Sequence, residues 1–300
     1  MLSRRTLLKF LGASLVSLTA GAAYAFGYGP LQRPRIARYR LAPRQWPQGQ
    51  ALRIVALSDI HVVEPWMSPE RLRGIVADAN ALRPDLVLLL GDFVAGMRKF
   101  RLDTVPASAW APALGGLSAP LGVHAVLGNH DWWDDREVPR SRTGMPYTRR
   151  ALEEAGIRVL HNEAVHIRQG EKGFWLAGLG DQLALPTARR NRWQSLADLP
   201  ATLAACTNDD PVLLMAHEPD IFPEVPDRVS LTLSGHTHGG QVNLFGWRPA
   251  VPSRFGDRFA YGHIVEEGRH LLVSGGLGCS IAPVRVGVAP EIVLIELGEA

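Results

Sequence analysis

The sequence has little cysteine, no one-sided block of charge and no repeated or low-complexity segment. Two cysteines, Cys206 and Cys279, can form at most one bridge, so a disulfide framework is excluded. We expect two buried free thiols, which is how isolated cysteines usually behave. Lys and Arg total 32 against 29 Asp and Glu, without the clustering that nucleic-acid binding requires. We therefore expect no nucleic-acid partner.

An apolar segment at the N-terminus predicts export. The basic stretch Ser3–Lys9 precedes uncharged residues 10–32, and its paired arginines resemble a twin-arginine signal. Ala23-Tyr24-Ala25 offers a cleavage site, whereas the length also suits an anchor across about 30 Å of hydrocarbon. Both alternatives stay open. Either one places the protein in the periplasm or at the extracytoplasmic face of a bacterial inner membrane, with the segment as its membrane contact.

The domain organisation follows from this segment and from the prolines and arginines behind it. We expect a twin-arginine-like signal or membrane anchor at 1–30, a linker at 31–50 and one folded domain at 51–300.

Continuous apolar runs alternate with helical patterns after residue 50. The runs predict strands at 52–58, 86–90, 122–127, 212–216 and 231–234, and also near Val159, 165–167 and 174–179. Helices are predicted from Ser68-Pro69 to Pro84, at 147–155 and at 191–205. This alternation is typical of an α/β sheet covered on both faces. Strands near His263, 271–274 and 292–297 lack long helices between them, which suggests a second, more antiparallel sheet.

Five short segments supply residues that can bind metal, and each follows a predicted strand. They are Asp59-x-His61, Gly91-Asp92, Gly128-Asn129-His130-Asp131, His217 and Gly235-His236-x-His238. Imidazole and carboxylate groups suit zinc, manganese or iron. Open α/β sheets bind ligands at the carboxyl ends of their strands. The pattern therefore predicts a metal centre at this edge.

In this order the five segments resemble those of the calcineurin-like metallophosphoesterases, over nearly all of the chain after about residue 50. Segments 234–241, 275–278 and 290–292 are similar to an exported bacterial branch, the YkuE/YaeI-like group. The resemblance implies a four-layer α/β/β/α sandwich with two mixed sheets and a dimetal site at the strand C-terminal ends. It implies one divalent ion, Mn, Zn or Fe, at Asp59, His61, Asp92 and His238. A second ion is implied at Asp92, Asn129, His217 and His236, with Asp92 bridging.

The remaining site assignments concern catalysis and substrate. His130 is expected to stabilise the transition state or to protonate the leaving oxygen, and Asp131 to orient the His130 imidazole. Arg285 is a candidate phosphate clamp, with a structural arginine as the alternative. Trp247 is a candidate wall of the substrate cleft, with a core aromatic as the alternative.

The expected function is metal-dependent hydrolysis of a phosphodiester, a pyrophosphate or a phosphomonoester by a monomer, with a lipid-linked or nucleotide-linked substrate as a special case. Asp92 is not followed by the longer motif ending in Asp-Arg-Gly, which argues against a Ser/Thr protein phosphatase. Ala95 stands where purple acid phosphatases have a tyrosine ligand. The alternatives are a non-catalytic metal-binding scaffold and a nuclease on the same fold.

Overall fold

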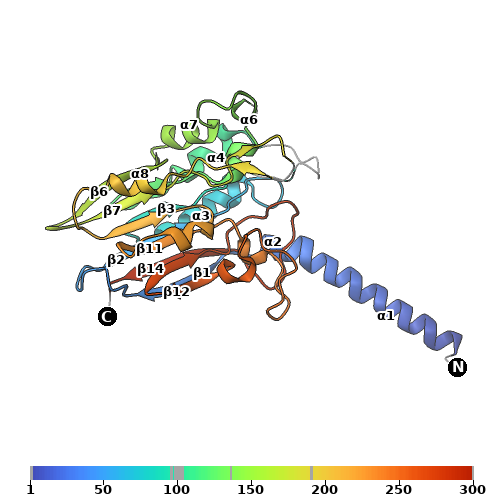
Figure 1. The fold of residues 1–300 in the computed structure, drawn as a ribbon. Helices are drawn as coiled ribbons and strands as arrows, with labels where there is room; N and C mark the ends of the chain where they lie inside the picture. The colour runs from blue at the N-terminus through green and yellow to red at the C-terminus, as the bar shows by residue number, and fades with distance from the viewer. Residues whose placement is uncertain (1–2, 95–96, 98–104, 136, 190–191, 299–300) are drawn as a thin grey trace.

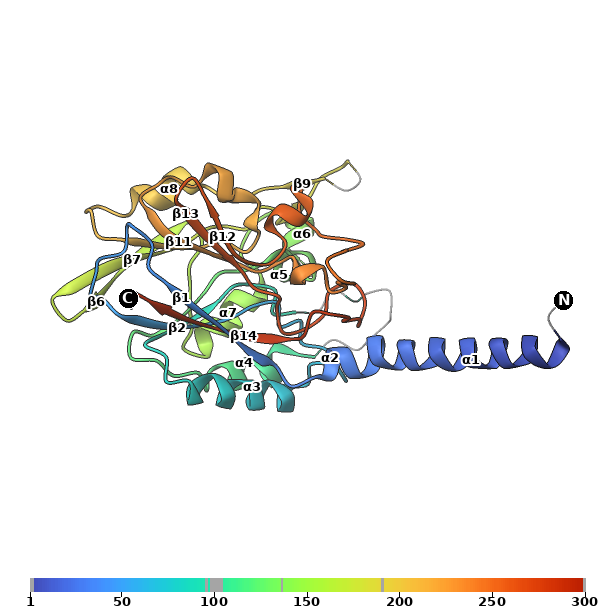
Figure 2. The same ribbon diagram turned by 90° about the horizontal axis from the view of Figure 1, so that it is seen from below.

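A computed structural model of the chain describes residues 3–94, 97, 105–135, 137–189 and 192–298. Ala95 lies outside these residues. The body consists of two stacked sheets flanked by helices, and a long N-terminal helix projects from it (Figures 1 and 2). This architecture confirms the predicted four-layer α/β/β/α sandwich with two mixed sheets.

The first sheet has six strands, and five of them lie where the sequence predicts a strand. Its order is β1 (Arg35–Leu41), β14 (Glu291–Leu297), β2 (Leu52–Leu57), β3 (Leu86–Leu89), β4 (Val123–Ala125) and β5 (Arg158–Val159). Strands β2 to β5 run parallel to one another, and β14 pairs antiparallel with β2. The carboxyl ends of β2, β3 and β4 therefore meet at one edge.

The second sheet also has six strands and is parallel in its interior. Its order is β12 (Gly262–Glu266), β13 (Arg269–Val273), β11 (Val229–Ser234), β10 (Val212–Met215), β7 (Lys172–Gly178) and β6 (Glu163–Gln169). Only the two edge pairs, β12 with β13 and β6 with β7, are antiparallel. A separate hairpin joins β8 (Leu185–Pro186) to β9 (Trp193–Gln194).

Alternating side chains explain why the sheets stack. On β2, Val55 and Leu57 pack toward helices, whereas Ile54 and Ala56 pack between the sheets. Successive strand residues face opposite sides, so a strand that is apolar at every position is covered on both faces. Strand β10 follows the same rule, with Leu213 and Met215 toward the first sheet and Leu214 toward the outer layer of the second.

Short helices form the outer layers. The α-helices are α1 (Arg4–Ala22), α2 (Gly29–Leu31), α3 (Pro69–Ala81), α4 (Ala107–Leu114), α5 (Asn129–Trp133), α6 (Val138–Ser141), α7 (Tyr147–Glu154) and α8 (Leu199–Ala204). A π-helix, η1 (Ala23–Tyr28), continues α1, and 3-10 turns form η3 (Pro219–Glu224), η4 (His238–Gly240) and η5 (Gly256–Phe259). Helix α3 begins where predicted, because the Ser68 side chain accepts a hydrogen bond from the Arg71 amide.

Two predictions about local structure are corrected. The segment 31–50 was predicted to be a linker, but it contains β1, which pairs along its whole length with β14. The helix predicted at 191–205 is shorter: α8 starts at Leu199, capped by Asp198, while Trp193 lies in β9. Pro200 is tolerated in the first turn of a helix but not in its interior, so a helix starting at 191 would be interrupted. Asn191 itself lies outside the described residues.

The two cysteines are free, as expected, and both are buried. Cys206 packs in the outer cluster of the second sheet, whereas Cys279 packs beside Val63 and Met97. They therefore contribute to packing in separate parts of the molecule.

The N-terminal helix carries exposed apolar side chains on its surface, among them Phe10, Leu15, Val16 and Leu18. Among the described residues, no helix combines the length and apolar character required to cross a bilayer.

Candidate metal centre

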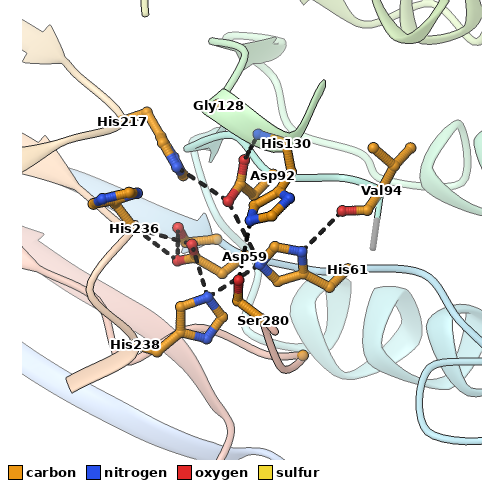
Figure 3. A network of polar contacts seen from close by, with 12 residues as sticks. Asp59, His61, Asp92, Val94, Gly128, His130, His217, His236, His238 and Ser280 are labelled. Carbon is orange, nitrogen blue, oxygen red and sulfur yellow. Dashed lines mark hydrogen bonds and ion pairs between the residues drawn. The ribbon is translucent and has the colours of Figure 1, made fainter. Parts of the chain in front are cut away.

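Six of the sequence-predicted ligands converge where the two sheets meet (Figure 3). Asp59 and His61 follow β2, and Asp92 follows β3. His217 follows β10, and His236 and His238 follow β11. All six side chains are buried, with at most 8% of their surface exposed. Residues more than a hundred positions apart thus share one water-poor site.

Asp59, His61 and His238 form the first group. Their ligand atoms all lie within 4.8 Å of one another. The two Nε2 atoms of His61 and His238 are 3.0 Å apart, and His238 Nε2 lies 3.4 Å from Asp59 Oδ1. Converging imidazole nitrogens and a carboxylate are a donor set that suits a divalent transition metal ion.

Asp92, His217 and His236 form the second group, again with ligand atoms within 4.8 Å of one another. Asp92 Oδ2 lies 3.3 Å from His217 Nε2 and 3.5 Å from His61 Nε2, so this oxygen stands between the two groups. That is the position of the bridging carboxylate which the family resemblance implies.

Two buried polar atoms on residues predicted to bind metal make no well-formed hydrogen bond within the described part of the chain. They are Asn129 Oδ1 and His217 Nε2, the latter in ion-pair contact with Asp92 Oδ2 at 3.3 Å. Buried polar atoms are nearly always paired, because an unpaired one costs about 1–3 kcal/mol. These two atoms, together with the facing nitrogens of the first group, fit a site that holds two cations.

Backbone carbonyls set the orientation of two of the rings. His61 Nδ1 lies 2.8 Å from the Val94 carbonyl, and His217 Nδ1 lies 2.7 Å from the Leu90 carbonyl. Since a carbonyl can only accept, each Nδ1 donates, and Nε2 of a neutral ring keeps its lone pair for a ligand.

Burial also favours the neutral form of three of the histidines. It lowers the pKa of His61 to about 4 and that of His236 to about 3, and it lowers the pKa of His238 well below its usual value. Neutral imidazole is the form that binds metal. Asp92 stays ionised: burial raises its pKa, but His217 and the other nearby histidines outweigh burial and hold its pKa well below the usual value.

The backbone at the site is strained. Five of the predicted ligands have a positive φ, namely Asp59 (52°), His61 (47°), Asp92 (58°), His236 (67°) and His238 (53°). Each such residue costs on the order of 1–3 kcal/mol and is typical of functional sites. Gly235 permits the tight packing, because a Cβ there would lie 1.8 Å from Ser58 Oγ and 2.6 Å from Asp59 Oδ2. The fold thus holds the side chains in an arrangement that local preference opposes.

His130 lies beside the ligand groups, with its ring centroid 5.1 Å from that of His61, but Asp131 does not orient it. The carboxylate of Asp131 accepts hydrogen bonds from the backbone amides of Asp92, Phe93 and Gly128 at 2.9–3.0 Å. The His130 ring instead faces Asp134, with Nδ1 3.3 Å from Oδ2. On helix α5, residues four positions apart share a face, whereas adjacent residues do not. The prediction for Asp131 is therefore corrected: this residue fixes two ligand loops.

Arg285 is buried completely, which contradicts its predicted role as a phosphate clamp. Its guanidinium donates to the carbonyls of Gly275, Gly278 and Val288. Its Nη2 also lies 3.3 Å from His238 Nδ1. Arg285 therefore supports the glycine-rich loop behind His238.

Tryptophans other than Trp247 lie near the site. Trp247 is 63% exposed and lies in a turn, where its amide donates a hydrogen bond to the Leu244 carbonyl. Its role in substrate binding stays a prediction. The Trp133 ring packs edge-on against the His130 ring, with 5.0 Å between the ring centroids. It also stacks on the Trp193 ring, with 4.0 Å between the centroids. Sequence reasoning missed Trp193 because it placed that residue in a helix.

Sequence reasoning also missed Ser280 and Asp134. Ser280 Oγ lies 3.0 Å from His130 Nε2. The available signals were the position of Ser280 two residues after the Gly275–Gly278 segment and the spacing of Asp134 four residues after His130.

The match to a family model agrees with this geometry. The sequence matches the model of the calcineurin-like phosphoesterase family over residues 52–240, a range that includes every predicted metal ligand. It is 28% identical to the metallophosphoesterase YkuE of Bacillus subtilis, over 99% of this chain and 98% of that relative. It is 29% identical to phosphodiesterase YaeI of Escherichia coli, over 99% of this chain and 100% of the relative. A solved dimetal phosphatase from Danio rerio is 15% identical, with a TM-score of 0.39 over 75% of this chain and 88% of its own.

Proposed function

The chain belongs to the calcineurin-like phosphoesterase family and is a metal-dependent phosphoesterase, and from this premise we propose that it hydrolyses phosphodiesters. The observation that carries the proposal is the place of Asp92 Oδ2 between His61 Nε2, at 3.5 Å, and His217 Nε2, at 3.3 Å. A carboxylate in that position can be shared by two cations.

The two ions would be held by residues from both sheets. Asp59, His61, Asp92 and His238 would bind one ion, and Asp92, Asn129, His217 and His236 the other. When bound, two such ions polarise the phosphate oxygens and supply an activated water as nucleophile. Manganese, zinc and iron all suit these ligands.

Asp131, His130 and the burial of the site have separate roles in the reaction. Asp131 holds the loops of Asp92 and Gly128 together, because its carboxylate accepts three backbone hydrogen bonds from them. His130 donates its Nε2 proton to the leaving oxygen while the P–O bond breaks and leaves its electron pair on that oxygen. The buried surroundings exclude bulk water from the ligand side chains, which strengthens their electrostatic contacts.

The relative YaeI, which is named a phosphodiesterase and aligns over the whole chain, supports a diester as substrate. A lipid-linked or nucleotide-linked diester is the special case that we favour. The exposed apolar side chains of α1 and the stacked pair Trp133 and Trp193 support it. A substrate with an apolar or aromatic alcohol group would find both surfaces on the same protein.

Turnover by metal-loaded protein tests the proposal. Purified protein is incubated with Mn²⁺ or Zn²⁺ and given bis-p-nitrophenyl phosphate or the corresponding monoester. We expect faster turnover of the diester, and its loss on chelation. Metal binding without turnover of either ester would show a non-catalytic scaffold and overturn the proposal. DNA cleavage with a steep dependence on salt would instead indicate a nuclease.

We also propose that the N-terminal segment stays on the enzyme and holds it at the extracytoplasmic face of the membrane. In support, Gly29 and Pro30 are buried. The Ala25 carbonyl accepts a hydrogen bond from the Arg285 amide, and the Phe26 carbonyl accepts one from Trp66 Nε1. We expect full-length protein in the membrane fraction, lost when Arg4 and Arg5 are replaced by lysine. A mature N-terminus at Phe26 would contradict retention.

A further inference from the structure

His130 is held on three sides by side chains that the predicted metal site does not use. Nδ1 faces Asp134 Oδ2 at 3.3 Å, and Nε2 faces Ser280 Oγ at 3.0 Å. The ring edge packs on Trp133 at 5.0 Å. An imidazole with a partner on each nitrogen has little freedom to flip or rotate. The orientation of His130 is therefore built into the fold.

Ser280 itself is fixed from two directions. Its amide donates to Gln241 Oε1 at 2.6 Å. Two residues earlier, the Gly278 amide donates to the Asp59 carbonyl at 2.7 Å, and a Cβ at Gly278 would lie 2.1 Å from the Ile60 carbonyl oxygen. The loop that carries Ser280 is thus tied to the segment that carries Asp59 and His61.

Asp134 is fixed by the helix. It follows α5 directly, and its amide donates to the His130 carbonyl at 3.0 Å. The i, i+4 spacing then brings its carboxylate onto the face of the helix that carries the His130 ring. Of the two ring nitrogens of His130, the one that faces this carboxylate is Nδ1.

We infer that Asp134 and Ser280 are positioning residues that aim His130 Nε2 at the leaving oxygen of the phosphoester. This inference rests on the proposed role of His130 as the proton donor. Asp134 holds Nδ1 of the His130 ring, so that Nε2 is the nitrogen left to donate to the substrate. The Ser280 hydroxyl lies where Nε2 donates, and so shows where the leaving oxygen would bind. The leaving alcohol would then depart beside the Ser280 hydroxyl.

The dependence of rate on the leaving group tests the inference. Methyl p-nitrophenyl phosphate has a leaving group that departs readily without a proton, whereas methyl phenyl phosphate needs one. Correct aim therefore matters for the phenyl ester. We expect Asp134→Asn and Ser280→Ala to lower kcat on the phenyl ester about 10- to 100-fold and on the nitrophenyl ester less than about threefold, with KM nearly unchanged on both.

Matched controls separate positioning from general damage. Asp227→Asn and Ser195→Ala change exposed residues of the same types and should leave both rates unchanged. Ser280→Thr keeps a hydroxyl and should recover most of the phenyl-ester rate. In a His130→Ala background, Asp134→Asn should have little further effect, because both residues act through one group.

Each outcome is decisive. Equal losses on both esters, or losses that add fully to that of His130→Ala, would show a structural role and overturn the inference. Unchanged rates would overturn it as well. Wild-type protein that turns over neither ester would instead contradict the proposed function, and the inference would fail with it.

Discussion

The Nε2 atoms of His61 and His238 face each other at 3.0 Å, with both rings buried and nearly parallel, at 19°. Because the Arg285 guanidinium faces His238 Nδ1 at 3.3 Å, a neutral His238 ring carries its proton on Nε2 and donates it to His61 Nε2. A divalent cation can take the place of this proton, because Asp59 Oδ1 lies 3.4 Å from His238 Nε2 and completes a set of three donors. The pair therefore indicates where the first ion binds.

Replacement of His238 tests this directly. We expect His238→Ala to lower the metal content from about two ions per chain to about one, and kcat/KM at least about 100-fold, because an essential ligand is lost. Elemental analysis after gel filtration measures the content. His263→Ala removes a histidine outside the two groups and is the control. Two ions retained by the His238 variant would exclude it as a ligand.

Asp131 should matter for folding more than for proton transfer. Asp131→Ala leaves three buried amides, those of Asp92, Phe93 and Gly128, without an acceptor. At about 1–3 kcal/mol for each unsatisfied group, the free energy of unfolding should fall by about 3 kcal/mol or more. Urea denaturation measures this loss. Unchanged stability with a selective loss on poor leaving groups would restore the role that the sequence predicted for Asp131.

Arg285 should stabilise the glycine-rich loop and, through it, His238. Arg285→Met keeps the bulk of the side chain but removes the donors to the Gly275, Gly278 and Val288 carbonyls. We expect the free energy of unfolding to fall by about 3 kcal/mol and the metal affinity to fall about 10-fold. Urea denaturation and metal titration measure the two effects. Arg254→Met, at an exposed ion pair, should change stability by less than about 1 kcal/mol. A KM increase without loss of stability would instead favour the phosphate clamp.

The N-terminal segment should contribute to stability only from about residue 25 onward. The carbonyls of Ala25, Phe26, Pro30 and Gln32 accept hydrogen bonds from Arg285, Trp66 and Arg71. Deletion of residues 1–22 should leave Tm nearly unchanged, whereas deletion of 1–32 should lower it by roughly 4–8 °C. Calorimetry on both truncated proteins gives the answer. Equal Tm values would show that these contacts are weak in solution.

The sequence alone located most strands and the residues that follow them. Continuous apolar runs have one stable use in an α/β protein, a strand buried on both faces, and the polar residues at their ends are then forced to one edge. Asp59, Asp92 and His217 could be predicted in this way because their placement depends only on the strand before them. The prediction of a linker at 31–50 was wrong. Strand β1 mixes exposed and partly buried residues and has no continuous apolar run, so only its pairing with β14 identifies it as a strand.

Only the tertiary structure decided which groups serve His130 and His238. The choice of Asp134 over Asp131 depends on where α5 begins, and Ser280 reaches His130 from 150 positions away through the packing of the two sheets. The burial of Arg285 likewise depends on how the last loop folds over His238. Such contacts join residues that share no local pattern, and the left-handed backbone at five predicted ligands runs against local preference. Local sequence determines which residues end the strands, and global packing determines which of them touch.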